Sequence, residues 1–312
     1  MATLRDIKRR INAVKGTAKI TQAMKMVAAA KLKRAQKAIE SARPYVLKLS
    51  DMLSNLVTAI GKDYSHPLIK DPDEVKNIAV IVIASDRGLC GSFNNNLFRD
   101  VKNYIEGPLK EEYPDANVNI VPVGQKTVQF FKKHGYEIIK EFPGIFKELD
   151  YSHAQDIVNT VKPGFINDEI DKVIIYFNEF VSSIRQEPKR IQLLPIESAE
   201  EQLAENQKFS KKAEPKEDRP TGQMNAEYIF EPDKESILDV LLPKLIDINV
   251  WRTLLESHAA EHAARMMAMD NATTNAKDLI QNLELKYNKA RQQSITTEML
   301  EIVSGAEALH QG

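Results

Sequence analysis

Residues 4–60 read LRDIKRRINAVKGTAKITQAMKMVAAAKLKRAQKAIESARPYVLKLSDMLSNLVTAI and carry the strongest periodicity in the chain. Alternate steps of three and four residues from Leu4 to Ile60 meet an apolar side chain everywhere except at Thr21 and Lys25. A repeat held in one register over so many turns is typical of a coiled-coil helix. At 1.5 Å per residue this helix would extend roughly 85 Å. Pro44 would at most bend it, because the repeat resumes beyond the proline.

A helix with one apolar stripe needs a second surface to cover the stripe, and the C-terminal region supplies one. The same stepping from Leu255 to Ser294 meets mostly apolar side chains. We expect this second helix to begin near Ser236, as its N-cap, and to run to about Ser304, where Gly305 acts as a stop signal. The most economical arrangement winds the two terminal helices together as an antiparallel coiled coil.

Between these helices the periodicity changes to alternating strands and helices. Buried strands are predicted at residues 78–84 (IAVIVIA), 118–123 (VNIVPV) and 172–177 (KVIIYF), with an edge strand at 191–196 and helices at 95–106, 125–134 and 152–161. Continuous apolar runs of this length are typical of strands covered on both faces. The predicted fold class is therefore α/β with long helices: the terminal coiled coil plus a central doubly wound, Rossmann-like α/β domain.

The predicted boundaries divide the chain into four parts: residues 1–62 (N-terminal helix), 76–196 (α/β domain), 197–235 (charged insertion and linker) and 236–305 (C-terminal helix). The net charge of −1 hides a strong asymmetry, since residues 1–50 hold 13 Lys and Arg against Asp6 and Glu40, or 13 − 2 = +11. One cysteine excludes an internal disulfide framework. No apolar run is long enough to span a membrane as a helix.

A glycine-containing turn at residues 85–91 (SDRGLCG) follows the first predicted strand, where nucleotide-binding loops occur. It could hold a phosphate at a helix N-terminus. Its glycine spacing is not G-x-G-x-x-G, however, and no Walker lysine follows. The segment Gly124-Gln125-Lys126-Thr127 resembles a Walker end only superficially. We favour a tight turn that packs the Cys90 thiol.

Two further alternatives come from the helices. His258, Glu261 and His262 match the H-x-x-E-H zinc signature of a metallopeptidase. That site needs a third protein ligand and a cleft, whereas His262 falls in the apolar seam. The basic N-terminal helix could bind nucleic-acid phosphates, yet its charges accompany an unbroken seam and no aromatic residue precedes Tyr45. We expect neither zinc nor nucleic acid to be bound.

Four parts of the sequence resemble the gamma subunits of the rotary F-type ATP synthases. They are residues 7–36 (IKRRINAVKGTAKITQAMKMVAAAKLKRAQ) with SARPY at 41–45, then SDRGLCGSFN at 85–94, EHAARMMAMDNATTNA at 261–276 and YNKARQQSITTEMLEIVSGAEAL at 287–309. The resemblance implies a non-catalytic rotor that needs no cofactor. Its coiled coil would stand inside a ring of three alpha and three beta subunits, and its α/β domain would sit with the epsilon subunit on the ring of c subunits.

The resemblance also implies which residues meet these partners. They are Met24, Lys25, Arg87, Cys90, Arg265, Arg291, Gln292, Ile302 and Val303. Met24 and Lys25 would face the beta subunits. Arg265, Arg291 and Gln292 of the C-terminal helix match positions implicated in contacts with beta. The pair in the middle motif would touch beta or epsilon. The last two residues would lie near the shaft tip, in an apolar collar.

Residues 197–219 form a charged insertion, for which a solvated loop is predicted. Photosynthetic relatives carry a regulatory segment with a cysteine pair in this region, and the absence of cysteine here excludes thiol control. A restraint on reverse rotation by this insertion is a hypothesis. The sequence start does not resemble a mitochondrial presequence, so we expect a peripheral protein on the cytoplasmic side of a bacterial plasma membrane.

Overall fold

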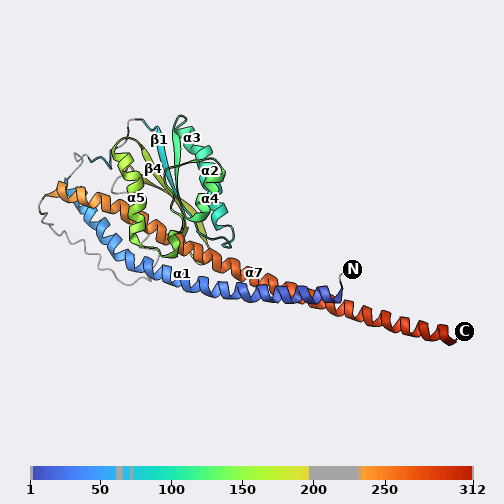
Figure 1. Cartoon of the computed structure of the whole chain (residues 1–312). Helices are drawn as coiled ribbons and strands as arrows, with labels where there is room; N and C mark the ends of the chain where they lie inside the picture. Colours follow the sequence, from blue (N-terminus) through green and yellow to red (C-terminus); the bar gives the residue numbers. More distant parts are fainter. Residues whose placement is uncertain are drawn as a thin grey trace. The chain divides into compact units, whose positions relative to one another are not determined.

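A computed structural model of the chain describes residues 3–60, 66–70, 72, 74–196, 231 and 233–310. The chain divides into two compact units, the helical unit (residues 1–29 and 265–312) and the α/β unit (residues 30–264). The terminal helices α1 (Leu4–Ile60) and α7 (Lys234–His310) each continue from one unit into the other (Figure 1). The predicted fold class is confirmed, while the insertion at 197–219 lies outside the described residues.

In the helical unit, α1 and α7 run antiparallel and cover each other's stripe. Every position of the predicted α1 repeat from Leu4 to Ala28 is buried or half-buried. On α7 the buried side chains are Met269, Thr273, Ala276 and Leu283. The direction follows from the side-chain contacts, because ascending positions on α1 meet descending positions on α7: Lys15 with Glu284, Thr21 with Thr273, and Lys25 with Asp270.

The α/β unit is built on a five-stranded sheet in the order β3-β2-β1-β4-β5. The strands are β1 (Asn77–Ile83), β2 (Asn117–Val123), β3 (Glu137–Ile138), β4 (Lys172–Phe180) and β5 (Gln186–Leu194). The first four are parallel, and β5 is an antiparallel edge strand. The chain therefore reverses its direction of winding between β1 and β4, as a doubly wound sheet requires.

Helices cover both faces of this sheet (Figure 1). One core contains Ile78, Val80 and Val82 of β1, packed against α2 (Phe93–Glu106), α3 (Pro108–Glu112) and α4 (Gln125–Lys133). The opposite core contains Ala79, Ile81 and Ile83, packed against α5 (Tyr151–Ile166) and the short 3-10 helix η1 (Ile145–Lys147). The alternation along β1 explains why the strand is apolar at every position from Ile78 to Ile83.

The stripes of both terminal helices enter this second core. On α1 the contributing side chains are Val46, Leu49, Leu53 and Leu56, and on α7 they extend from Leu238 to Leu254. In the α/β unit the two stripes thus pack on the sheet and α5 as well as on each other. The sequence predicted only their mutual packing, because periodicity does not reveal a third surface.

Two predicted boundaries of the C-terminal helix are wrong. Its N-cap is Asp233 rather than Ser236, since the Asp233 carboxylate accepts the Ser236 backbone N–H at 2.8 Å and its hydroxyl at 2.7 Å. The Ser236 hydrogen bonds also lower the pKa of Asp233. At the other end α7 continues through Gly305 to His310. An exposed glycine costs a helix only about 1 kcal/mol relative to alanine, so it does not have to end one.

The edge strand also differs from the prediction, since β5 begins at Gln186 rather than Ile191. The first half of β5 is rich in charged residues, so it contains no apolar run that would predict a strand. The positive charge of Arg190 makes a cation–π contact, since its guanidinium lies 3.9 Å from the centroid of the Tyr104 ring. The short elements α3, β3 and η1 were not predicted. Among the described helices, none combines the length and apolarity needed to cross a membrane.

Replacement of Leu97 by alanine tests the α2 face of the sheet. Leu97 is fully buried in the core beneath α2, so Leu97→Ala should lower the free energy of unfolding by about 2–5 kcal/mol. Urea unfolding monitored by circular dichroism measures the change. Val240→Ala, at an exposed position of α7 in the same unit, is the control and should change stability by less than about 0.5 kcal/mol. Equal losses would contradict the assigned core.

Candidate partner interface

Polar contacts between α1 and α7 accompany the two interruptions of the apolar stripe. The Thr21 and Thr273 hydroxyls lie 2.7 Å apart in a buried position. The Lys25 ammonium lies 2.7 Å from the Asp270 carboxylate, with both side chains partly exposed. A polar pair in an apolar seam fits only one alignment of the helices, so these contacts specify register. Thr273 was already on the predicted seam, but its pairing with Thr21 was not predicted.

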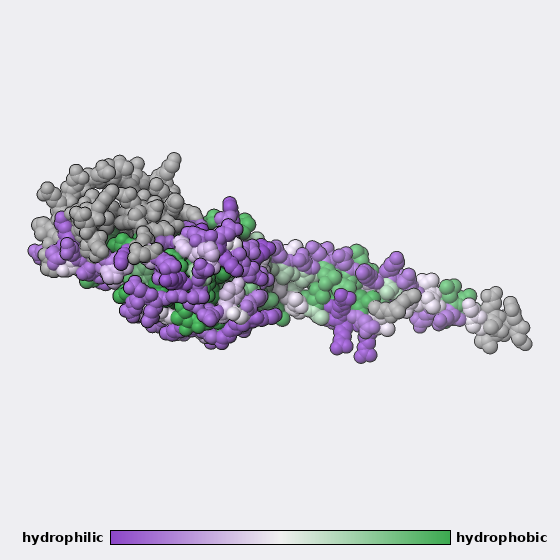
Figure 2. Space-filling model, turned by 90° about the horizontal axis from the view of Figure 1, so that it is seen from above, coloured by the Kyte–Doolittle hydropathy of each residue, from purple (hydrophilic) through white to green (hydrophobic). Residues whose placement is uncertain are grey.

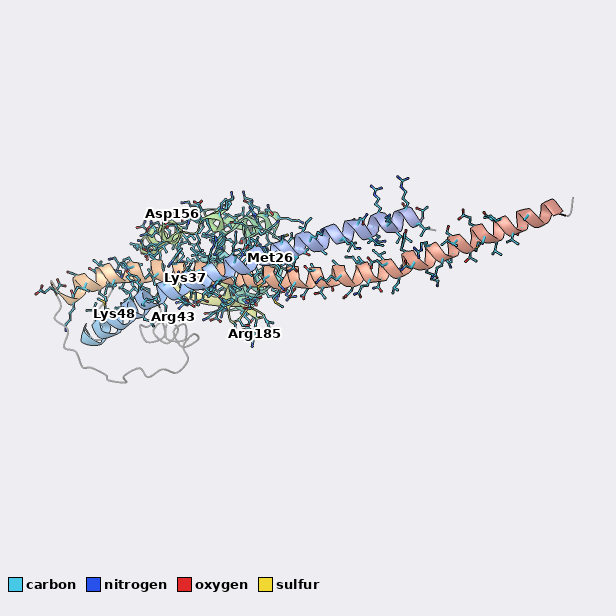
Figure 3. All side chains as sticks on the ribbon, turned by 90° about the horizontal axis from the view of Figure 1, so that it is seen from below. Met26, Lys37, Arg43, Lys48, Asp156 and Arg185 are labelled. Atoms are coloured by element: carbon cyan, nitrogen blue, oxygen red, sulfur yellow. The ribbon has the colours of Figure 1, made fainter. Side chains whose placement is uncertain are left out.

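The outer side of α1 in the helical unit carries exposed apolar residues that the sequence analysis did not single out. Ile20 and Val27 lie seven residues apart, and Met26 (Figure 3) lies next to Val27; all three are about 60% exposed. Apolar surface is visible among the charged side chains of the paired helices (Figure 2). Exposed apolar surface rimmed by charge is typical of a protein-binding face. The only signal in the sequence was the seven-residue spacing of Ile20 and Val27 outside the predicted stripe.

The last part of α7 has no cover from α1 among the described residues. Residues 291–306, here termed the α7 tip, are all exposed. They include Arg291 and Gln292 of the predicted contacts, and Ile302 and Val303 at 67% and 60% exposure. The other large apolar side chains exposed on the tip are Ile295, Met299 and Leu300. The tip is thus a single helix with apolar side chains available to a partner.

The loop at residues 85–94, here termed the Asp86 loop, follows the carboxyl end of β1. The Asp86 carboxylate accepts the backbone N–H of Gln125 at 2.9 Å, of Gly144 at 2.8 Å and of Phe146 at 3.1 Å. Gln125 is the first residue of α4. A carboxylate of the chain therefore occupies the N-terminus of α4, the helix that carries the superficial Walker match.

Gly124 allows this helix start to come close to β1. Its φ is +96°, and a Cβ atom there would collide with the Ala84 carbonyl oxygen. Lys126 of the superficial Walker match directs its ammonium to the Gln129 side chain at 3.1 Å, and Thr127 donates its hydroxyl hydrogen to the Val123 carbonyl at 2.9 Å. Both side chains thus form hydrogen bonds within or next to α4, which explains why the resemblance to a Walker motif is superficial.

Cys90 is packed, as the sequence analysis favoured. Its side chain is buried in a small core with Phe93 and Ala260 of α7. The Asn94 amide donates to the Cys90 sulfur at 3.4 Å. The neighbouring Leu89 adopts a left-handed backbone conformation, with φ of 64°, and is exposed. In this conformation Arg87 and Leu89, rather than the thiol, form the outer surface of the loop.

Helix α7 covers the crevice where the winding of the sheet reverses. The Ser257 hydroxyl of α7 donates to the Ile83 carbonyl at 3.3 Å, at the carboxyl end of β1. Doubly wound proteins bind ligands at this end of the strands, outside the reversal point. Here the place is taken by Ser257 and Ala260, both fully buried. The α/β unit uses its ligand-binding edge to hold a helix.

The H-x-x-E-H residues lie in the same contact. The His258 and His262 Nε2 atoms are 3.0 Å apart, and the His258 ring stacks on Phe146. Glu261 and His262 are buried. Within the described part of the chain, no group of three or more His, Cys, Asp or Glu side chains is arranged to hold a metal ion. The zinc metallopeptidase alternative is not supported.

The predicted contact residues thus occupy different environments. Met24 and Arg265 are half-buried, and Lys25 is paired with Asp270. Arg87 is exposed on the α/β unit, whereas Cys90 is buried. Only the residues of the α7 tip form one continuous exposed surface.

Comparison with known proteins gives one consistent family. The sequence model of the family described as ATP synthase matches residues 3–309. The ATP synthase gamma chain of Chlorobium phaeobacteroides (strain BS1) is 44% identical over 309 residues, 99% of each chain. That of Prosthecochloris aestuarii is 43% identical over 312 residues, again 99% of each.

Two solved structures share the fold. A chain of the Euglena gracilis mitochondrial ATP synthase is similar with a TM-score of 0.63 and 19% identity, covering 99% of this chain and 95% of that one. A chain from the central stalk and c-ring of the Tetrahymena thermophila mitochondrial enzyme is similar with a TM-score of 0.54 and 24% identity. It covers 81% of this chain and 99% of that one.

The threonine pair provides a test of register. Thr21→Val or Thr273→Val alone should lower the free energy of unfolding by about 1 kcal/mol, because the remaining buried hydroxyl loses a partner. The double replacement should cost less than the sum of the two, since neither hydroxyl then remains. Urea unfolding of the four chains measures this coupling. Strict additivity would show that the two hydroxyls do not act as a pair.

Asp86 provides a second test. Asp86→Ala should lower the free energy of unfolding by about 2–4 kcal/mol, because three backbone N–H groups lose their acceptor. Asp86→Asn should cost less, since one side-chain oxygen remains. The control Asp100→Ala removes an exposed carboxylate from α2 and should have an effect below about 0.5 kcal/mol. A loss at Asp86 no larger than at Asp100 would contradict the anchoring role.

Proposed function

This chain belongs to the ATP synthase gamma-chain family, and we propose that its helical unit turns inside a ring of three alpha and three beta subunits. A gamma chain is a non-catalytic rotor subunit of the synthase, which agrees with the role of Asp86 and α7 in closing the ligand-binding edge of the sheet.

The observation that carries the proposal is the α7 tip. Two antiparallel helices bury their stripes in the helical unit, and one of them continues as a single helix with exposed apolar side chains. Such a tip requires an apolar seat outside this chain, which a ring of subunits closed around it would supply. Ile302 and Val303 are the residues proposed to enter that seat, with Arg291 and Gln292 as polar contacts at its entrance.

Rotation would act on the ring because α1 and α7 present different faces around the pair. The apolar face with Ile20, Met26 and Val27 differs from the basic residues elsewhere on α1. Each beta subunit would meet a different face in turn and would be biased toward a conformation with different nucleotide affinity. The coupling is reciprocal, so nucleotide hydrolysis in the ring would turn the shaft backward.

The other predicted contacts take roles that follow from their environments. Met24 and Arg265 would meet the beta subunits at the edge of the exposed α1 face, and Lys25 would support that face through Asp270. Arg87 would contact beta or epsilon directly. Cys90 would act by packing the Asp86 loop that presents Arg87.

The α/β unit is proposed to rest with the epsilon subunit on the c ring, which proton flow turns. Torque would then pass into the helical unit through α1 and α7, because both helices continue unbroken from one unit into the other. The proposed location is peripheral, on the cytoplasmic side of a bacterial plasma membrane.

Reconstitution with matched alpha and beta subunits tests the tip. The unmodified chain should co-purify at one copy per ring and alter multisite ATP hydrolysis, while hydrolysing no ATP alone. Chains with Ile302→Asp and Val303→Asp together should bind the ring at least about tenfold more weakly, because two apolar side chains lose their burial. Co-purification and ATPase rates at several chain concentrations measure both effects.

The matched control is Ile184→Asp, which places the same charge at an isoleucine 79% exposed on the α/β unit. It should leave assembly with alpha and beta unchanged. Normal binding by the doubly substituted chain would show that the tip is not held in an apolar seat of the ring. Failure of the unmodified chain to join the ring would contradict the rotor role itself.

A further inference from the structure

A groove of about 420 Å³ lies in the α/β unit between α1, α5 and α7. Three aromatic side chains line it, one from each helix: Tyr45, Tyr151 and Trp251. Asp247 of α7 and Gln155 of α5 supply polar groups, and the remaining wall is mostly aliphatic. This aromatic groove lies outside both the helical unit and the contact of α7 with the carboxyl edge of the sheet.

The aromatic rings offer both faces and edges to an occupant. The Tyr151 and Trp251 ring centroids are 6.0 Å apart with an angle of 81° between the ring planes, an edge-to-face pair. Tyr45 is 56% exposed, a large aromatic surface left to solvent. Aromatic faces attract cations through their quadrupoles, and most strongly where the cation leaves water.

One acidic group accompanies the rings. Burial raises the pKa of Asp247, and the charge of Lys162 with a hydrogen bond from Gln155 offsets only part of that effect. Burial, with the nearby charge of Asp247, raises the pKa of Tyr151 to about 12, so this phenol stays neutral at physiological pH. The carboxylate is therefore an incompletely compensated negative charge beside three aromatic rings. A cation entering the groove would stabilise it.

We propose that the aromatic groove binds one arginine side chain presented by a protein partner of the α/β unit. A guanidinium can stack on an aromatic ring while it donates hydrogen bonds to a carboxylate, and its weak hydration favours it over an ammonium in a partly apolar site. The three aliphatic carbons of the arginine stem match the apolar wall. Lys244 also lines the groove and would disfavour a partner carrying several adjacent positive charges. This inference goes beyond rotor function and holds whichever protein supplies the arginine.

Trp251 allows a direct test because it is the one tryptophan of the sequence. The full-length chain is titrated with the capped pentapeptide Ala-Ala-Arg-Ala-Ala while Trp251 fluorescence is recorded. A matched peptide replaces arginine by citrulline, which has nearly the same shape and no charge. The expected result is a saturable change with the arginine peptide and at least tenfold weaker binding of the citrulline peptide.

Variants of the chain separate the groove from general charge attraction. Asp247→Asn and Tyr45→Leu should each weaken the arginine peptide at least fivefold, with unchanged far-ultraviolet circular dichroism. The control Asp156→Asn removes an exposed carboxylate from α5 that does not line the groove, and it should leave binding unchanged. The proposal is overturned by equal binding of the two peptides, by no saturable change, or by equal effects of Asp247→Asn and Asp156→Asn.

Discussion

The apolar stripe on α1 constrains the rest of the structure, because a helix cannot cover its own side chains. In the helical unit α7 covers the stripe, and in the α/β unit the sheet and α5 share that role. The covering helix comes from the opposite end of the sequence, so the chain has to close on itself. Within the α/β unit, both helices pack their stripes into the same core on one face of the sheet.

The α/β unit keeps the form of a nucleotide-binding fold without its chemistry. The Asp86 carboxylate accepts the Gln125 N–H at the start of α4, and Ser257 and Ala260 fill the crevice at the sheet reversal. These side chains are part of the protein and cannot dissociate as a nucleotide can, so the loops at this edge of the sheet have a permanent anchor. This permanence suits a structural role, because the contact with α7 does not depend on ligand concentration.

The periodic elements could be predicted from the sequence because each carries its own signal. The stripe of α1 predicts a helix, and the apolar runs of β1, β2 and β4 predict strands, without reference to the rest of the chain. The Asp86 anchor could not be predicted, since its donors lie 39 to 60 residues away. The start of β5 was missed because Arg190 is stabilised by Tyr104, a distant partner. The family resemblance indicated contact residues, but only coordinates separated the buried Cys90 from the exposed Ile302.

The unpaired end of α7 has a mechanical consequence. Two helices packed along a seam resist bending and twisting together, since either motion must disrupt the side chains between them. Beyond residue 290 only the hydrogen bonds of one helix oppose such motion, and Gly305 adds a residue with few conformational restraints. Stiffness must therefore fall toward the C-terminal end. Within the helical unit, the single-helix part of α7 is therefore the more flexible part, and the part paired with α1 is the stiffer one.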